Sequence, residues 1–197
     1  MTGHFLQIKK LHILIALPVY LVLASCGEPA ATKPAKTDYV HTGDSLINAT
    51  FDTLRNALTA AMHDKGAAGA VAFCNEKAYP ITSTYASGNI IIKRVAEKYR
   101  NPQNAPDSTD ALQWRKFASA KGNGETLQPA LVEEKNITHY YKPILLQPMC
   151  SSCHGEKNKD ILPPVLSTID SLYPNDRATG FAPGDLRGMW KISFVQK

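Results

Sequence analysis

The spacing of apolar side chains predicts an amphipathic helix that begins near residue 44. From that point, large apolar residues recur every three or four positions, which is the period of one helix face. They are Ile47, Phe51, Leu54, Leu58 and Met62. Asp44 or Ser45 can cap the start, because a side-chain oxygen there accepts a hydrogen bond from a free backbone N–H.

A second helical pattern follows Gly66 and covers residues 67–79. One of its faces consists mainly of small side chains, and Pro80 is expected to end or kink the helix because proline lacks a backbone N–H. The face comprises Ala70, Val71, Cys74, Ala78 and Ile81.

The C-terminal half alternates between strand and helix signals. Residues 89–99 contain a β-branched run that fits either a strand or the start of a helix. A polar turn then precedes a helix that is capped by Asp107 or Ser108 and runs to about residue 120, with Leu112 and Phe117 inward. The remaining signals predict strands, at 131–134, 137–145 and 190–195.

Residues 1–25 are typical of an export signal, with a basic start, an apolar run and small residues before Cys26. The tetrapeptide ending at Cys26 resembles a bacterial lipobox, which predicts a lipidated Cys26. An ordinary secretory signal or a true membrane anchor is the alternative. Residues 26–43 carry almost no large apolar side chains and are expected to form a flexible tether. We therefore expect an exported protein, held by lipid on a bacterial membrane and facing the periplasm or the cell surface.

Composition and net charge limit the kinds of function that this chain is expected to have. With 197 residues and 44% hydrophobic residues, the chain can bury one ordinary core, so residues 44–197 are predicted to form a single domain. The formal net charge of +5 is too mild to indicate nucleic-acid binding, and two of its lysines lie in the export signal. No acidic pair, phosphate loop or nucleophile with a recognisable base is visible, so an enzyme is not expected.

The strongest chemical signal is the C-x-x-C-H sequence of Cys150, Cys153 and His154. This is the attachment motif of c-type haem, in which two cysteines bond the haem and the histidine ligates its iron. Export supports one covalent haem c, because bacterial haem attachment takes place outside the cytoplasm. A disulfide, a thioredoxin-like dithiol and half of a zinc site are the alternatives; Pro148 and Gly155 around the motif fit poorly with a thioredoxin helix.

The second axial ligand is less clear from the residues alone. Cys74 is by default a small buried apolar side chain, but as a thiolate it could provide the sixth iron ligand. The other possible ligands are Met62, His63, His139 and Met189. Lys142, Arg100, Arg177 and Arg187 are candidates to pair with the two haem propionates, although a solvated basic face also explains them.

Five blocks of sequence in this order resemble the haem-c-binding, PAS-like domains of exported bacterial proteins and sensors, a family of undefined function. The resemblance covers residue 44 to the C-terminus. The blocks are residues 71–78, 100–107, 142–155, 173–181 and 184–188.

This resemblance implies an α+β fold, with a PAS-like antiparallel sheet flanked by helices. It also implies that His154 and Cys74 are the two axial iron ligands. The expected function is then redox sensing or electron transfer at the membrane surface, with an unidentified redox or signalling protein as partner and a homodimer possible. Gas sensing of nitric oxide or carbon monoxide is one alternative. A structural zinc site made from Cys74, Cys150, Cys153 and His154, or a redox dithiol, is the other.

Overall fold

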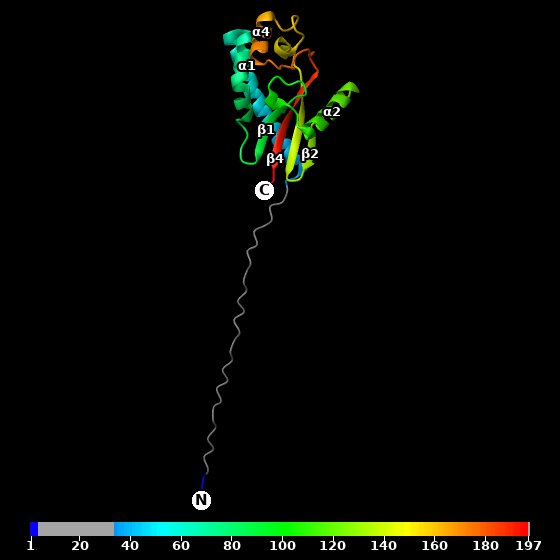
Figure 1. The fold of residues 1–197 in the computed structure, drawn as a ribbon. Coiled ribbons are helices and arrows are strands. Elements are labelled where there is room, and N and C mark those ends of the chain that lie inside the picture. Colours follow the sequence, from blue (N-terminus) through cyan, green and yellow to red (C-terminus); the bar gives the residue numbers. More distant parts are fainter. Residues whose placement is uncertain (4–33, 197) are drawn as a thin grey trace. The chain divides into compact units, whose positions relative to one another are not determined.

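The structure is a computed structural model that describes residues 1–3 and 34–196. Cys26, nearly all of the predicted export signal and the first part of the predicted tether lie outside the described residues. From residue 34 onward the chain forms one unit of helices and strands (Figure 1). In order these are α1 (Lys36–Ser83), β1 (Ile90–Val95), η1 (Pro102–Asn104), α2 (Ser108–Gly122), β2 (Ala130–Glu134), β3 (Ile137–Leu145), η2 (Pro148–Cys150), α3 (Ser151–His154), α4 (Pro163–Leu172) and β4 (Leu186–Val195).

The four strands form one antiparallel sheet in the order β1-β4-β3-β2. The last strand of the sequence therefore lies between β1 and β3. The β-branched run that fitted either a strand or a helix is the strand β1, and the three predicted strands are confirmed. The α+β class with an antiparallel sheet and helices is likewise confirmed.

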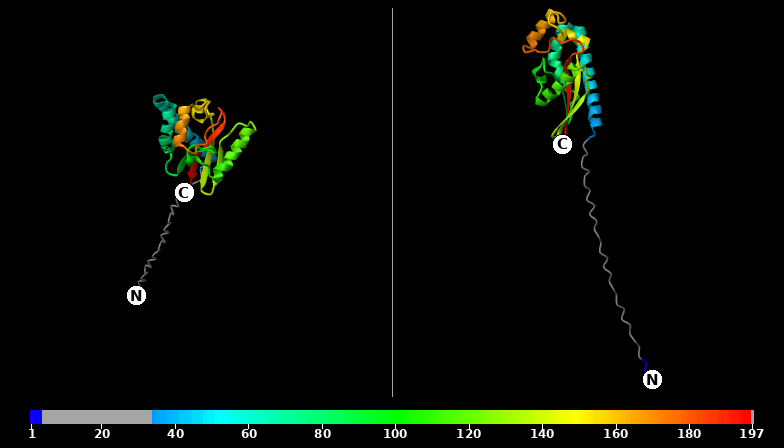
Figure 2. Two further views of the ribbon diagram at one scale, coloured as in Figure 1. Left: turned by 45° about the horizontal axis from the view of Figure 1, so that its top comes forward. Right: turned by 90° about the vertical axis from the view of Figure 1, so that its right-hand side faces the viewer.

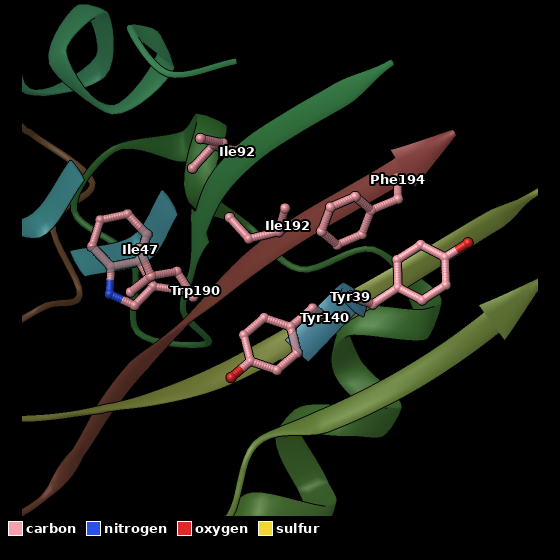
Figure 3. Close-up of a cluster of buried hydrophobic side chains, with 7 residues drawn as sticks. All are labelled: Tyr39, Ile47, Ile92, Tyr140, Trp190, Ile192 and Phe194. Atoms are coloured by element: carbon pink, nitrogen blue, oxygen red, sulfur yellow. The ribbon is translucent and has the colours of Figure 1, made fainter. Parts of the chain in front are cut away.

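The two faces of the sheet carry different side chains because neighbouring residues of a strand point to opposite sides. On β4, Trp190, Ile192 and Phe194 face α1 and form a buried cluster with residues of that helix (Figure 3). Met189 lies on the other face and packs with Phe117 of α2. Helices α1 and α2 thus cover opposite faces of the sheet (Figure 2).

Helix α1 contains both predicted helices, joined by a kink at Gly66. The backbone there has φ 67° and ψ 177°, a conformation that is essentially restricted to glycine. The predicted break at this position is confirmed. Pro80 lies inside the second segment, which continues to Ser83.

The prediction of a flexible tether is wrong for residues 36–43. Helix α1 begins at Lys36, and Tyr39 is buried with its ring centroid 5.0 Å from that of Phe194. Gly43 lies so close to the Tyr140 ring that a larger residue would clash with it. One tyrosine and one glycine in a polar stretch give almost no apolar pattern, so only the folded sheet supplies their packing partners.

Helix α2 begins as predicted at an Asp107 cap. The Asp107 carboxylate accepts a hydrogen bond of 2.8 Å from the Asp110 amide, and Asp110 accepts one of 3.2 Å from the Asp107 amide. Phe117 is buried, but Leu112 is 55% exposed, so its predicted inward orientation is wrong. The buried face is partly polar, and its other members are Asp110 and Gln113.

The C-terminal helices pack against the second half of α1. Val71 of α1 forms a buried cluster with Val165, Ile169 and Tyr173. Helix α4 lies beside this part of α1 (Figure 1). Among the residues that the structure describes, no helix is both long enough and apolar enough to cross a membrane.

Candidate functional site

A cavity of about 470 Å³ lies between α1, one end of β1 and β3, and the segment formed by η2 and α3. This volume falls within the range of roughly 300–1,000 Å³ that is typical of ligand and cofactor sites. Its lining includes Cys74, Cys150, Cys153 and His154. The fold thus brings together the motif and a cysteine that lies some seventy-five residues earlier in the sequence.

The local sequence explains how the motif is held. Pro148 starts the η2 turn, α3 follows directly, and Gly155 ends it. A Cβ atom on Gly155 would lie 2.6 Å from the Ser151 carbonyl oxygen and equally close to the Asp160 carboxylate, so only glycine fits there. Cys150 and Cys153 are half-buried free thiols. All strand pairs are antiparallel, so the βαβ unit of a thioredoxin-like site is not present in this sheet.

The imidazole of His154 is oriented by the backbone. Its Nδ1 lies 2.8 Å from the Ala178 carbonyl oxygen, and because a carbonyl only accepts, Nδ1 carries the proton. Burial, together with the nearby Arg187 and Arg100, lowers the pKa of His154 well below 6.5. The ring is therefore neutral, and Nε2 keeps a free lone pair, which is the form that binds a metal.

Cys74 lies on α1 and lines the same cavity. Burial raises the pKa of its thiol above the usual value of 9.0, and Arg94 acts in the opposite direction. The free thiol is thus protonated at neutral pH. An ion that binds the sulfur would displace that proton.

The alternative ligands are mostly placed elsewhere. Met62 lines the cavity, but His139 is hydrogen-bonded to Ser193 on the sheet face that α2 covers. Met189 is fully buried in the cluster on that same face. His63 is exposed and lies 2.8 Å from the Asp64 carboxylate.

Two arginines of the cavity wall have a buried Nε that lacks a hydrogen-bond partner among the described residues, namely Arg94 and Arg187. Burial lowers the pKa of both, that of Arg187 to about 10. A buried cationic group without a counter-ion is costly. The cavity is therefore suited to a ligand with an apolar body and anionic groups.

The predicted propionate partners have different roles in this structure. Lys142 donates to the Asp44 carboxylate at 2.6 Å, and Arg100 is paired with Asp176. Arg177 does not line the cavity and lies over the Tyr99 ring. Of the four, Arg187 lines the cavity with an Nε that has no hydrogen-bond partner among the described residues, so it stays a candidate. Arg94 was missed; its only sequence signal is an arginine inside a β-branched strand, where a charged side chain needs a partner.

The zinc alternative is not supported. No group of three or more His, Cys, Asp or Glu side chains that could hold a metal ion occurs among residues 34–196. Cys74, Cys150, Cys153 and His154 share the cavity wall without forming such a group, which suits a large planar cofactor between them better than a bare ion.

Residues 33–194 match the family model Tll0287-like, and the chain belongs to that family. Among solved structures, the chain is similar to the cyanobacterial haem protein Tll0287, with 26% sequence identity and a TM-score of 0.61. This match covers 83% of the chain and 98% of that protein. No curated protein matches the chain. Membership in a haem-binding family of undefined function, which the five sequence blocks implied, is confirmed.

Proposed function

We propose that this chain binds one haem c covalently and acts in redox sensing or electron transfer at a bacterial membrane surface. The observation that supports it best is that Cys74, the two motif cysteines and a neutral His154 line one cavity. Two arginines of the same wall have a buried Nε without a hydrogen-bond partner among the described residues. The histidine and Cys74 suit the iron of a haem, and the two arginines suit its two carboxylates.

Each of these residues has a distinct role in the proposal. Cys150 and Cys153 would form the thioether links to the haem, and His154 Nε2 and Cys74 Sγ would hold its iron. Arg94 and Arg187 supply the cations for the propionates. When bound, the haem iron supplies one-electron redox chemistry.

The residues around the cavity favour a low reduction potential for the proposed haem iron. An anionic thiolate from Cys74 stabilises ferric iron more than a methionine would. The cationic guanidinium groups of Arg94 and Arg187 act against this, since positive charge favours the reduced state, but the propionates offset them. A midpoint potential as high as that of a methionine-ligated cytochrome would contradict Cys74 ligation.

We propose that the α+β domain is PAS-like, that residues 1–25 are removed on export, and that lipid on Cys26 anchors the protein to the membrane. Its partner is then a redox or signalling protein rather than nucleic acid or an enzyme substrate. The mild net charge of +5 and the C-x-x-C-H motif support this view.

The first test is an absorption spectrum of the protein produced with haem-maturation machinery, oxidised and then reduced, with a pyridine haemochrome assay on denatured material. We expect a c-type haemochrome, and ferric bands that change in Cys74→Ala. Met62→Leu is the matched control, because Met62 lines the same cavity, and its bands should stay as in the wild type.

Other results would point elsewhere. A colourless protein despite competent maturation would overturn haem attachment. Bands that change in Met62→Leu and not in Cys74→Ala would assign the sixth position to the methionine. A ferrous spectrum that shifts on adding carbon monoxide would mean that Cys74 leaves on reduction, which favours gas sensing.

A further inference from the structure

The segment after α4 lies along the C-terminal end of the motif helix. The Gly180 amide donates to the Gly155 carbonyl at 2.7 Å, and the Phe181 amide donates to the His154 carbonyl at 3.0 Å. These bonds fix the backbone of the motif histidine to residues that follow it by more than twenty positions.

The same segment holds the side chain of His154. Its Nδ1 donates to the Ala178 carbonyl at 2.8 Å. The Ala178 amide in turn donates to Asp176 Oδ1 at 3.0 Å. The Asp176 carboxylate therefore helps to position the carbonyl that accepts from this imidazole.

Asp176 is itself held by Arg100. Arg100 Nε lies 3.1 Å from Oδ1, and Nη2 lies 3.2 Å from Oδ2, in a two-bond geometry. The two side chains are only 12% and 4% exposed, so solvent screens this pair little and its geometry is tightly defined.

Arg100 also reaches the motif directly. Its Nη2 donates to the Cys153 carbonyl at 2.6 Å and lies 3.5 Å from the Ala178 carbonyl oxygen. The last carbonyls of a helix have no partner within it, so this donor stabilises the end of α3. One ion pair thus touches both the helix that carries His154 and the residue that accepts from its ring.

We propose that Arg100 and Asp176 form a brace that fixes the ring plane and tautomer of His154, and that both are positioning residues for the iron ligand. This inference rests on the proposed function, because it treats His154 as that ligand. Hydrogen-bond partners of a ligating histidine orient its ring and raise its basicity. The brace also accounts for two of the sequence blocks, residues 100–107 and 173–181, which contain no iron ligand.

The test uses haem-loaded protein with two brace variants. Asp176→Asn keeps the size of the side chain but loses its charge, and its amide nitrogen faces the Arg100 guanidinium. Arg100→Lys keeps the charge and loses the planar two-bond geometry. The matched control is Asp110→Asn. The Asp110 side chain is also buried and is ion-paired with Lys191, but it lies on the sheet face covered by α2.

The readout is the ferric low-spin electron paramagnetic resonance spectrum, since its g-values respond to the orientation and strength of the axial ligands. We expect shifted and broadened g-values in Asp176→Asn and a smaller shift in Arg100→Lys. Asp110→Asn should lose thermal stability and keep the wild-type g-values. Pyridine haemochrome assays should show the same covalent haem content in all four proteins.

Two outcomes would contradict the brace, and they differ from a failure of the proposed function. Unchanged g-values in both haem-loaded brace variants, with lowered stability alone, would reduce the pair to a structural role. Equal g-value shifts in Asp110→Asn would show that general loosening causes the effect. Absence of a c-type haemochrome in the wild type would instead overturn haem attachment itself.

Discussion

At the scale of single residues, the arginines of the cavity are the least expected feature. Arg94 lies on β1 between Lys93 and Val95, and its Nε is shielded from solvent without a partner in the described part of the chain. A natural chain retains such a group where a ligand completes its bonding. In the proposed complex, Arg94 would therefore pair with a carboxylate of the haem.

We predict that Arg94→Met changes the free energy of unfolding in opposite directions in the haem-free and the haem-loaded protein. In a haem-free background made with Cys150→Ala and Cys153→Ala, the free energy of unfolding should rise by about 1 kcal/mol, since an unsatisfied buried donor is removed. In the haem-loaded protein it should fall, because a propionate loses its cation. Chemical denaturation of both forms measures the difference.

The control for this prediction is Arg115→Met. Arg115 is exposed on α2, and its replacement should change the free energy of unfolding by less than about 0.5 kcal/mol in either form. If Arg94→Met had the same sign in both forms, Arg94 would have no role in holding the anionic groups.

At the scale of elements, α2 is tied to the sheet by charge as well as by apolar contact. Lys191 of β4 lies 2.9 Å from the Asp107 carboxylate and 2.7 Å from that of Asp110. The Tyr141 hydroxyl donates to Asp110 at 2.7 Å. A lysine in the middle of an alternating strand is thus paired by the first turn of the helix that covers it.

This contact predicts a pH dependence. Partial burial alone would raise the pKa of Asp107, but hydrogen bonds from the Asp110 amide and from Lys191 lower it from 3.8 to about 2. A carboxyl whose pKa is depressed on folding contributes stability above its unfolded pKa and loses it as the pH falls through the folded value. Relative to Asp107→Asn, the wild type should be more stable near neutral pH, and the difference should shrink between about pH 4 and about pH 2.

The substitution isolates charge, because asparagine is also a good helix cap. Denaturation of both proteins at a series of pH values measures the effect, with Asp52→Asn as a control for an exposed ion pair on α1. A wild-type advantage that stays constant down to pH 2 would mean that the Asp107 charge contributes nothing to folding.

At the scale of the whole molecule, the proposed lipid on Cys26 determines where the domain works. We predict that the wild type incorporates radiolabelled fatty acid and fractionates with the membrane, and that Cys26→Ser incorporates no fatty acid. The reason is that lipid on Cys26 would be its anchor. Cys74→Ala, which replaces another single cysteine, should stay with the membrane. Equal incorporation of fatty acid into Cys26→Ser would contradict the lipid anchor.

The features that the sequence predicts correctly are those set by residues that lie close together along the chain. Local interactions within about ten residues set the kink at Gly66, the Asp107 cap and the strand pair at 131–145, and all of these were predicted. The C-x-x-C-H motif is equally local, so its residues were found directly. The α+β class was implied by the family resemblance, and the structure confirms it.

Only the tertiary structure decided the features that join distant segments. It placed Tyr39 in the core, left Leu112 exposed, and paired Lys142 and Arg100 with carboxylates that no spacing rule identifies. It also brought Arg94 to the cavity wall. Charged and polar side chains take their roles from whichever groups surround them after folding, whereas an apolar period already determines which side of an element is buried.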